Sequence, residues 1–338
     1  MARHRRRTRT PHRGAAALVL ALLLAGALPG TAGAADTVAF RIRDRRVVES
    51  SGLARDVANQ VYWTVNDSGD GGVVYGLAAN GRVRGTINFR AQPRDVEAVA
   101  VQGNRLYVAD IGDNEATRDQ VSVYFLTNPR PSGLTVTYNS FDFRYPDGAH
   151  DAETLLVDGS GRLTIVTKGA RGGVYQAPAQ PSRTGVNELR KVGDAPALVT
   201  DGVFLPGDRQ IALLTYGSVV VLDASSYAQV SSTPIPRQPQ AESLAVNLAG
   251  DGLLVGSEGR DSAVYALPLP EGSAGSPSAT PSPTASAATT AAAQTGQDDS
   301  ADAAAPDPRG RGTYLALGLA ALVALVAGVV VAAVRRPG

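Results

Sequence analysis

Residues 97–101 read EAVAV, and stretches of the same kind return as ETLLV at 153–157 and ESLAV at 242–246. Each one joins an acidic residue to a short apolar run of strand-forming side chains. Two further stretches, SGLA at 51–54 and DGVFL at 201–205, continue the series. The first residues of the five stretches are 46, 56, 48 and 41 positions apart, which is the length of a four-stranded propeller blade. The repeat therefore predicts an all-β propeller.

After each opening stretch the sequence predicts further short strands, which are bounded by turns containing Gly, Asp, Asn or Pro. The second unit, for example, continues with RLYVADI at 105–111, VSVYFL at 121–126 and TYNSFDFRY at 137–145. The fifth unit has no fourth strand of its own. We expect TVAFRIRD at 37–44 to supply it and to close the ring, so that no sheet edge stays exposed.

The predicted fold is therefore a five-bladed β-propeller over residues 35–270. A sixth blade, which would need about 40 more residues, and an open β-sandwich are the alternatives.

Both ends of the chain differ in composition from the predicted propeller. Residues 1–34 combine an arginine cluster, an apolar run and the small-residue site Ala32-Gly33-Ala34, as in a cleaved secretory signal peptide. Residues 271–313 are rich in Ser, Thr, Pro and Ala and cannot bury a core, so we expect a disordered stalk, with glycosylation left open. Residues 314–334 form an uncharged run long enough for one C-terminal transmembrane helix. The predicted location is the cell membrane, with the propeller extracellular and a cytoplasmic tail at 335–338.

Composition excludes several kinds of chemistry and partner. Residues 35–270 carry 22 Lys and Arg against 26 Asp and Glu, a net charge of −4, so the basic surface of a nucleic-acid-binding protein is missing. The chain has no cysteine, which removes disulfides, thiolate metal sites and cysteine nucleophiles. No motif indicates an organic cofactor. The only histidine after the predicted signal peptide is His150.

The opening residues form a column when the five stretches are aligned. In an antiparallel blade the first strand begins where the second ends, so the openings and the second-to-third turns share one face. Residues two positions apart in a strand also point to the same side. The column consists of Ser51, Glu97, Glu153, Asp201 and Glu242. Two positions earlier stand Glu49, Asp95, Asp151, Val199 and Gln240.

We expect the carboxylates of this column to meet at the channel mouth. At roughly 6 Å and an effective dielectric of about 20, two ionised carboxylates repel by about 3 kcal/mol. Such a ring must bind a cation, hold protons or accept hydrogen bonds. With oxygen ligands only, Ca²⁺ is the predicted cation and Mg²⁺ the second choice; backbone N–H groups of the adjacent blades are the alternative partners. The predicted metal ligands are Glu97, Glu153, Asp201 and Glu242, with Glu49, Asp95 and Asp151 nearby.

Two polar turns, NDSGDGG at 66–72 and DIGDNEATRD at 110–119, are expected at the rim of the same mouth. They resemble pieces of calcium loops without matching the EF-hand pattern, and Asp and Asn are equally typical of tight turns. The rim candidates for a second ion are Asp67, Asp70, Asp110, Asp113 and Asn114.

His150 lies in YPDGAHDAE at 145–153, directly before the third opening stretch. It is a candidate general base, with Asp151 and Glu153 as further catalytic candidates. The alternative is a hydrogen-bonding loop residue, which the absence of a GxSxG elbow favours.

Several motifs together resemble one family of exported β-propeller proteins from high-GC Gram-positive bacteria, labelled WD-repeat-like or esterase-like-of-phytase-like. The motifs are SSGLA (50–54), WTVNDSGD (63–70), DVEAVAV (95–101), LYVADIGDN (106–114), YPDGAHDAETLLVD (145–158) and TKG (167–169). The resemblance covers Glu49 to Leu269 and implies the propeller fold, but no particular activity. The Gly-His and Trp-Asp signature of true WD repeats is absent.

Two function classes follow from these observations. The first is a binding or interaction module whose acidic mouth holds a divalent cation and whose envelope, protein or small-molecule ligand the sequence leaves open. The alternative is a metal-dependent extracellular hydrolase that acts on a phosphoester, lactone or glycoside. Its predicted residues are the acidic column and His150.

Overall fold

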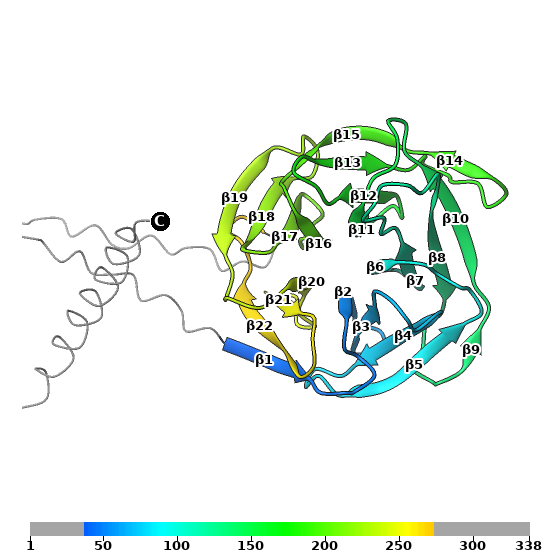
Figure 1. The fold of residues 1–338 in the computed structure, drawn as a ribbon. Helices are drawn as coiled ribbons and strands as arrows, with labels where there is room; N and C mark the ends of the chain where they lie inside the picture. The colour runs from blue at the N-terminus through cyan, green and yellow to red at the C-terminus, as the bar shows by residue number, and fades with distance from the viewer. Residues whose placement is uncertain (1–36, 274–338) are drawn as a thin grey trace, which may run out of the picture. The chain divides into compact units, whose positions relative to one another are not determined.

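The computed structural model describes residues 37–273, and these form 22 β-strands. The strands group into five sheets set around one central channel (Figure 1). The predicted five-bladed propeller is therefore confirmed, and the described residues contain neither a sixth blade nor a two-sheet sandwich. The predicted signal peptide, stalk, transmembrane helix and tail lie outside the described residues. No helix within residues 37–273 is long and apolar enough to span a membrane.

In four blades the strands follow the chain outward from the centre, and the fifth takes its outer strand, β1, from the start of the described chain. The inner strands are β2 (Ser50–Asp56), β6 (Val96–Gln102), β11 (Ala152–Val157), β16 (Val199–Phe204) and β20 (Ala241–Val246). The second strands are β3 (Val61–Asn66), β7 (Arg105–Asp110), β12 (Leu163–Thr167), β17 (Gln210–Thr215) and β21 (Gly252–Ser257). The third strands are β4 (Val73–Leu77), β8 (Val121–Thr127), β13 (Gly172–Gln176), β18 (Ser218–Asp223) and β22 (Ser262–Pro268). The outer strands are β5 (Val83–Phe89), β10 (Asn139–Arg144), β15 (Arg190–Ala195), β19 (Gln229–Pro234) and β1 (Thr37–Ile42). We number the blades 1 to 5 by the order of their inner strands.

Strand β1 closes the ring as predicted, because it pairs antiparallel with β22 and completes blade 5. Its inward side chains reach the next blade. Ile42 is 2% exposed, and the Phe40 ring stacks on Tyr62 of blade 1 with centroids 5.9 Å apart. The first described strand thus joins the last blade to the first.

Five apolar clusters hold the blades together, one at each junction between neighbouring blades. The junction of blades 1 and 2 contains Trp63, which is fully buried and donates its indole N–H to Asp56 at 2.9 Å. Trp63 is therefore a core residue and not a platform for a sugar ligand.

Two short strands were not predicted. Strand β9 (Thr135–Val136) pairs parallel with β5, and β14 (Val186–Glu188) pairs parallel with β10. Each is a loop of the following blade that covers the outer edge of the blade before it. Segments of two or three residues carry no periodic pattern, although they protect edges that would otherwise pair with another chain.

Removing the buried end of β1 tests ring closure. We expect Ile42→Ala to lower the free energy of unfolding by about 2 to 5 kcal/mol, because it opens a cavity between blades 5 and 1. Val38→Ala in the same strand, where the side chain is 41% exposed, should change it by about 0.5 kcal/mol or less. Urea unfolding of both variants measures the difference, and equal effects would show that β1 is not needed for closure.

Candidate functional site: the acidic mouth

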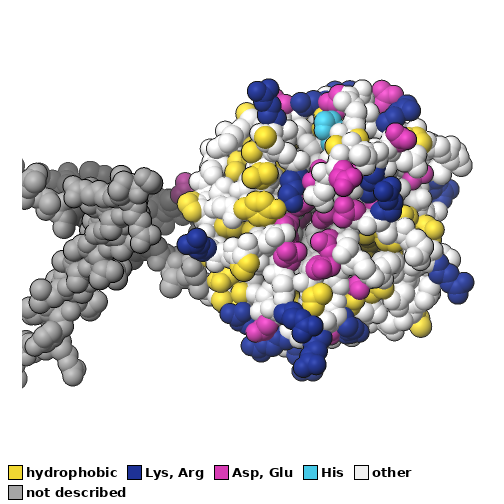
Figure 2. Space-filling model, viewed as in Figure 1, with side chains coloured by type: hydrophobic (Ala, Val, Ile, Leu, Met, Phe, Trp, Pro, Cys, Tyr) yellow, Lys and Arg dark blue, Asp and Glu magenta, His cyan; other side chains and the backbone are white. Residues whose placement is uncertain are grey.

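The start of each inner strand carries a β-bulge, and three of these bulges present a glutamate to the channel mouth. The register of β6 passes from Val96 opposite Asp110 to Ala98 opposite Ala109, which leaves Glu97 without a partner across the ladder. Glu153 and Glu242 occupy the same position in β11 and β20. We call Glu97, Glu153 and Glu242 the glutamate ring. Their exposed fractions are only 6%, 3% and 4%, and Figure 2 shows acidic side chains gathered over the centre of this face.

Asp201 is not a member of this ring. The bulge of β16 falls between Val199 and Asp201, so Thr200 takes the position of the glutamates. The sequence alignment was therefore one residue out at this blade, because it matched the acidic residues of the openings and β16 has its acidic residue one position after the bulge.

The Asp201 carboxylate lies deeper in the channel and ties three strands together. It accepts backbone N–H groups of Leu244 at 2.6 Å, Gly202 at 2.7 Å and, across the channel, Leu53 at 3.3 Å. Burial raises the pKa of Asp201, and these N–H donors oppose that rise. Its oxygens are used for structure, as the alternative interpretation of the acidic column predicted.

A lysine supplies a positive charge to the glutamate ring. Lys168, from the turn between β12 and β13, forms an ion pair with Glu153, and its side chain is only 17% exposed. The ammonium also lies 5.5 Å from the centroid of the Tyr216 ring. Although burial opposes the charge, the bond to Glu153 raises the pKa of Lys168 above its ordinary value. The ring therefore carries an internal cation.

Glu97 lies against a second carboxyl group. Burial first, and then the charge of Asp95, raise the pKa of Glu97 to about 9. Burial raises the pKa of Asp95, and the neighbouring Glu97 carboxyl opposes that rise. Gly112 makes this approach possible, because a Cβ there would lie 2.5 Å from the Asp95 carboxyl and 2.7 Å from Glu97. Ser51 donates its hydroxyl to Glu97 Oε2 at 3.3 Å.

Glu153 and Glu242 each keep one carboxyl oxygen that is buried and has no hydrogen-bond partner, Oε2 in both cases. The two carboxyls interact, because Glu153 opposes the rise that burial causes in the pKa of Glu242. Burial raises the pKa of both, and for Glu153 the charges of Glu97 and Glu242 add to it while Lys168 opposes it. Burying a carboxyl oxygen without a hydrogen-bond partner lowers the stability of the folded protein. A shared proton or a bound ligand would remove this penalty for both oxygens.

The other carboxylates predicted near the ring lie at its edge. Burial and a hydrogen bond with Glu49 raise the pKa of Asp67 to about 6, while Ser68 donates to Glu49 at 3.0 Å. Asp151 accepts the backbone N–H of Asp113 at 2.8 Å.

The remaining rim candidates serve mainly the turns in which they occur. Asp70 accepts hydrogen bonds from Asn66 and Tyr75, both at 2.6 Å. Asp110 forms a buried ion pair with Arg118 at 2.8 Å, and the backbone N–H of Arg118 binds Asp113 at 2.7 Å. Asn114 is exposed. These contacts describe stabilised turns, and nothing in them marks a second ion site.

His150 belongs to an aromatic cluster and not to the glutamate ring. Its Nε2 lies 3.0 Å from both Asp147 Oδ1 and the Tyr175 hydroxyl. The Tyr145 ring packs edge-on against the imidazole at 5.0 Å between centroids. These contacts match the hydrogen-bonding alternative that the sequence left open for His150.

The predicted cation fits the donor chemistry of the mouth but not its present arrangement. In residues 37–273, no three His, Asp or Glu side chains are positioned together to hold a metal ion. The available donors are carboxylate oxygens, which suit Ca²⁺, and three of them, Asp67 Oδ1, Glu153 Oε2 and Glu242 Oε2, are buried without partners. A metal ion would have to displace the Lys168 ammonium from Glu153.

Sequence reasoning missed three features of the site: the ion pair of Lys168, the close approach at Gly112 and the substitution of Thr200 for a glutamate. The first was accessible in part, because TKGARGG at 167–173 is one of the turns that the repeat assigns to this face. The others depend on side-chain packing and on the bulge.

Comparisons with known proteins add little beyond the fold. No protein-family model matches this chain, and no curated protein matches it in sequence. One similar solved structure is a gluconolactonase from Xanthomonas campestris, described as important in glucose secondary metabolic pathways. It is 16% identical, covers 68% of this chain and 88% of its own, and gives a TM-score of 0.39. At this level the activity of one chain does not transfer to the other.

The buried glutamates predict that stability falls as pH rises. Glu97 has a pKa of about 9 in the folded protein against an ordinary value of 4.5. Its contribution is therefore complete below about pH 4.5 and is lost between there and about pH 9, at up to about 1.4 kcal/mol per pH unit. We expect urea unfolding at pH 5, 7 and 9 with chelator to show this loss, and Glu97→Gln to reduce its slope. The exposed Glu188 provides the control Glu188→Gln; an unchanged slope in Glu97→Gln would contradict the assignment.

Proposed function

We propose that the protein is a hydrolase whose active site is the acidic mouth and which works with a divalent cation, Ca²⁺ before Mg²⁺. The observation that supports this most strongly is the pair of buried, unpartnered Oε2 atoms of Glu153 and Glu242. Carboxyl groups with raised pKa values at an open mouth are typical of sites that exchange protons with a substrate. A purely structural carboxylate would have its oxygens bonded, as Asp201 has.

The charge of the mouth selects the class of substrate. A phosphate monoester would approach a cluster of carboxylates, and the ammonium of Lys168 is already paired with Glu153. A neutral substrate avoids this repulsion. We therefore propose a lactone or a glycoside, in preference to a phosphoester.

Hydrolysis needs one protonated and one ionised carboxyl group, and the glutamate ring can provide both. A carboxyl that holds a proton near neutral pH can donate it to a leaving oxygen, and a neighbouring ionised carboxylate can accept one from water. Burial raises the pKa of all three glutamates, and Glu153 alone has an ammonium, that of Lys168, paired with it to oppose the rise. A divalent cation, when bound, would polarise the oxygen of the bond to be cleaved.

Cation binding at this mouth requires competition with Lys168. No three acidic side chains of residues 37–273 are now arranged around a metal ion, so we propose that Glu97, Glu153 and Glu242 become ligands by rearranging when Lys168 leaves Glu153. Asp201 is left out because backbone N–H groups already occupy its carboxylate.

The exchange of Lys168 for a cation predicts a gain in affinity on removing the lysine. We expect Lys168→Met to bind Ca²⁺ at least about tenfold more tightly than the unchanged protein, because the ion no longer displaces an ammonium. Calorimetric titration with CaCl₂ measures this, and Lys191→Met, at a lysine 44% exposed on the outer strand β15, is the matched control. Weaker or unchanged binding in Lys168→Met would exclude competition for the ring.

Hydrolysis itself is tested with a panel of lactones and glycosides, each assayed with Ca²⁺ and with chelator. We expect turnover that falls by about 100-fold or more in Glu242→Gln and Glu153→Gln, as is typical when a group that transfers protons is removed. Glu188→Gln should retain full turnover. Activity that survives both ring substitutions would place the chemistry elsewhere.

A binding module without turnover is the second candidate function. It is favoured by the position of His150, which is bonded to Asp147 and Tyr175 away from the glutamate ring and leaves the mouth without an imidazole base. Absence of turnover on the panel, together with a Ca²⁺-dependent rise in melting temperature that Glu153→Gln removes, would favour this candidate over the hydrolase.

We further propose that the propeller is exported and held at the outer side of the membrane, on the basis of residues 1–34 and 314–334 alone. In that case the mature chain begins at Ala35, and protease added to intact cells removes the propeller. Mass spectrometry of the purified protein measures its first residue. A chain that retains residues 1–34 and resists external protease would contradict this location.

A further inference from the structure

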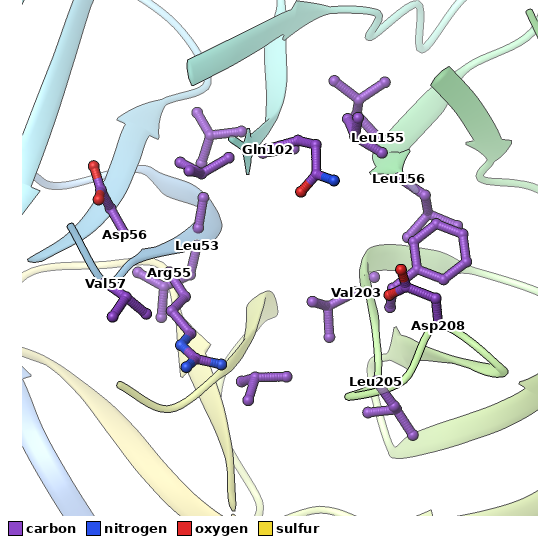
Figure 3. Close-up of a pocket in the computed structure, with 18 of the residues that line it drawn as sticks. Leu53, Arg55, Asp56, Val57, Gln102, Leu155, Leu156, Val203, Leu205 and Asp208 are labelled. Atoms are coloured by element: carbon purple, nitrogen blue, oxygen red, sulfur yellow. The ribbon is translucent and has the colours of Figure 1, made fainter. Parts of the chain in front are cut away.

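The channel has a second opening, at the ends of the inner strands, and its chemistry differs from that of the acidic mouth. A cavity of about 410 Å³ is lined there by the last residues of all five inner strands (Figure 3). Asp201, bonded to Leu53 and Leu244 across the channel, lies between the cavity and the glutamate ring. The volume falls within the range of small-molecule sites.

Most residues that line the cavity have apolar side chains, while polar side-chain and backbone atoms supply about half of its surface. Leu155, Leu156 and Leu205 belong to the clusters between blades and are only 2%, 2% and 1% exposed, whereas Val203 is partly exposed beside the open space (Figure 3). Val57, at the end of β2, is 49% exposed. An apolar group placed here would remove such surface from water, which is favourable by about 25 cal/mol per Å².

One cation enters this apolar cavity without a counterion. Arg55 extends from β2 toward the open space (Figure 3). Its Nε atom is buried without a hydrogen-bond partner. None of the hydrogen bonds or ion pairs found within residues 37–273 involves its guanidinium. Arg55 as a whole is only partly buried, so an anion that enters the cavity can pair with its guanidinium.

The nearby carboxylates do not fill that role. Asp56 points away from the cavity (Figure 3) and is bonded to the Trp63 indole at 2.9 Å and the Asn59 amide at 2.7 Å. Asp208, on the opposite wall, is exposed to solvent.

The guanidinium is instead held against backbone. A Cβ at Gly250 would lie 3.4 Å from each terminal nitrogen of Arg55, and Gly250 has a φ of 86° that favours glycine. The turn before β21 thus leaves room for the guanidinium without neutralising it. The side chain of Gln102 supplies a further polar group beside the open space (Figure 3).

We propose that this cavity binds an aliphatic carboxylate of short or medium chain length. The carboxylate forms a bidentate pair with Arg55, the geometry in which guanidinium groups bind carboxylates most strongly. The hydrocarbon chain packs on Val57 and Val203, whose side chains are exposed or partly exposed at the cavity. The site is separate from the acidic mouth, and it stands whether or not the proposed hydrolase activity is found.

Calorimetric titration of the full-length protein with octanoate tests the site, with octanol and inorganic phosphate as comparison probes. We expect octanoate to bind at least about tenfold more tightly than either, because octanol lacks the charge and phosphate lacks the chain. Octanol binding as tightly as octanoate would overturn the role of Arg55. Phosphate binding as tightly would overturn the role of the apolar wall, and no binding of octanoate would overturn the proposal as a whole.

Variants locate the bound octanoate. Arg55→Met keeps the length of the side chain and should weaken octanoate binding by roughly tenfold to a hundredfold, and Val203→Phe should weaken it by filling the cavity. Arg260→Met, at an exposed arginine in the turn between β21 and β22 on the opposite face, should leave it unchanged. Melting temperatures show that each variant is folded. If Arg55→Met unfolds, Arg55→Lys, which keeps the charge but loses bidentate geometry, should give an intermediate affinity. Full binding in a folded Arg55 variant would overturn the assignment.

Discussion

Antiparallel pairing of β1 with β22 is the contact on which the rest of the structure depends. It completes the fifth sheet from the two ends of the described chain and brings blade 5 against blade 1. Once the ring is closed, each blade buries an apolar cluster against both neighbours. Closure also brings the five inner strands around one narrow channel, so that their first residues meet at one end and their last residues at the other.

Convergence of the strands has opposite chemical consequences at the two ends of the channel. At one end the bulges of three inner strands bring Glu97, Glu153 and Glu242 together in a buried setting. There, burial and then the charge of neighbouring carboxylates raise the pKa of Glu97. The negative charge of Glu153 attracts Lys168. At the other end the same strands finish in apolar side chains, and Arg55 is the charge without a partner. Asp201 separates the two ends by bonding to strands on both sides of the channel.

Much of this architecture could be predicted from the sequence, because blade repeats are local and regular. The openings at Glu97, Glu153 and Glu242 fall at the starts of inner strands, and the segment at 37–44 contains the strand that closes the ring. The structure places Asp201 outside the glutamate ring for a specific reason. Every inner strand has the bulge, but β16 has Thr200 at the bulged position and its acidic residue one position later, so an alignment on acidic residues shifts this blade by one. Strands β9 and β14 were not predicted because they are too short to show a periodic pattern.

By itself, the sequence determined the number of blades, the closing strand and the face on which the acidic residues collect, since all three depend on the order and spacing of short strands. Only the tertiary structure decided which of those acids share the ring, that Lys168 is their countercharge, that His150 belongs to Tyr145 and Tyr175, and that Arg55 stands unpaired at the opposite opening. These facts depend on contacts between blades. Residues far apart in the chain meet there at distances that the spacing along the chain does not specify.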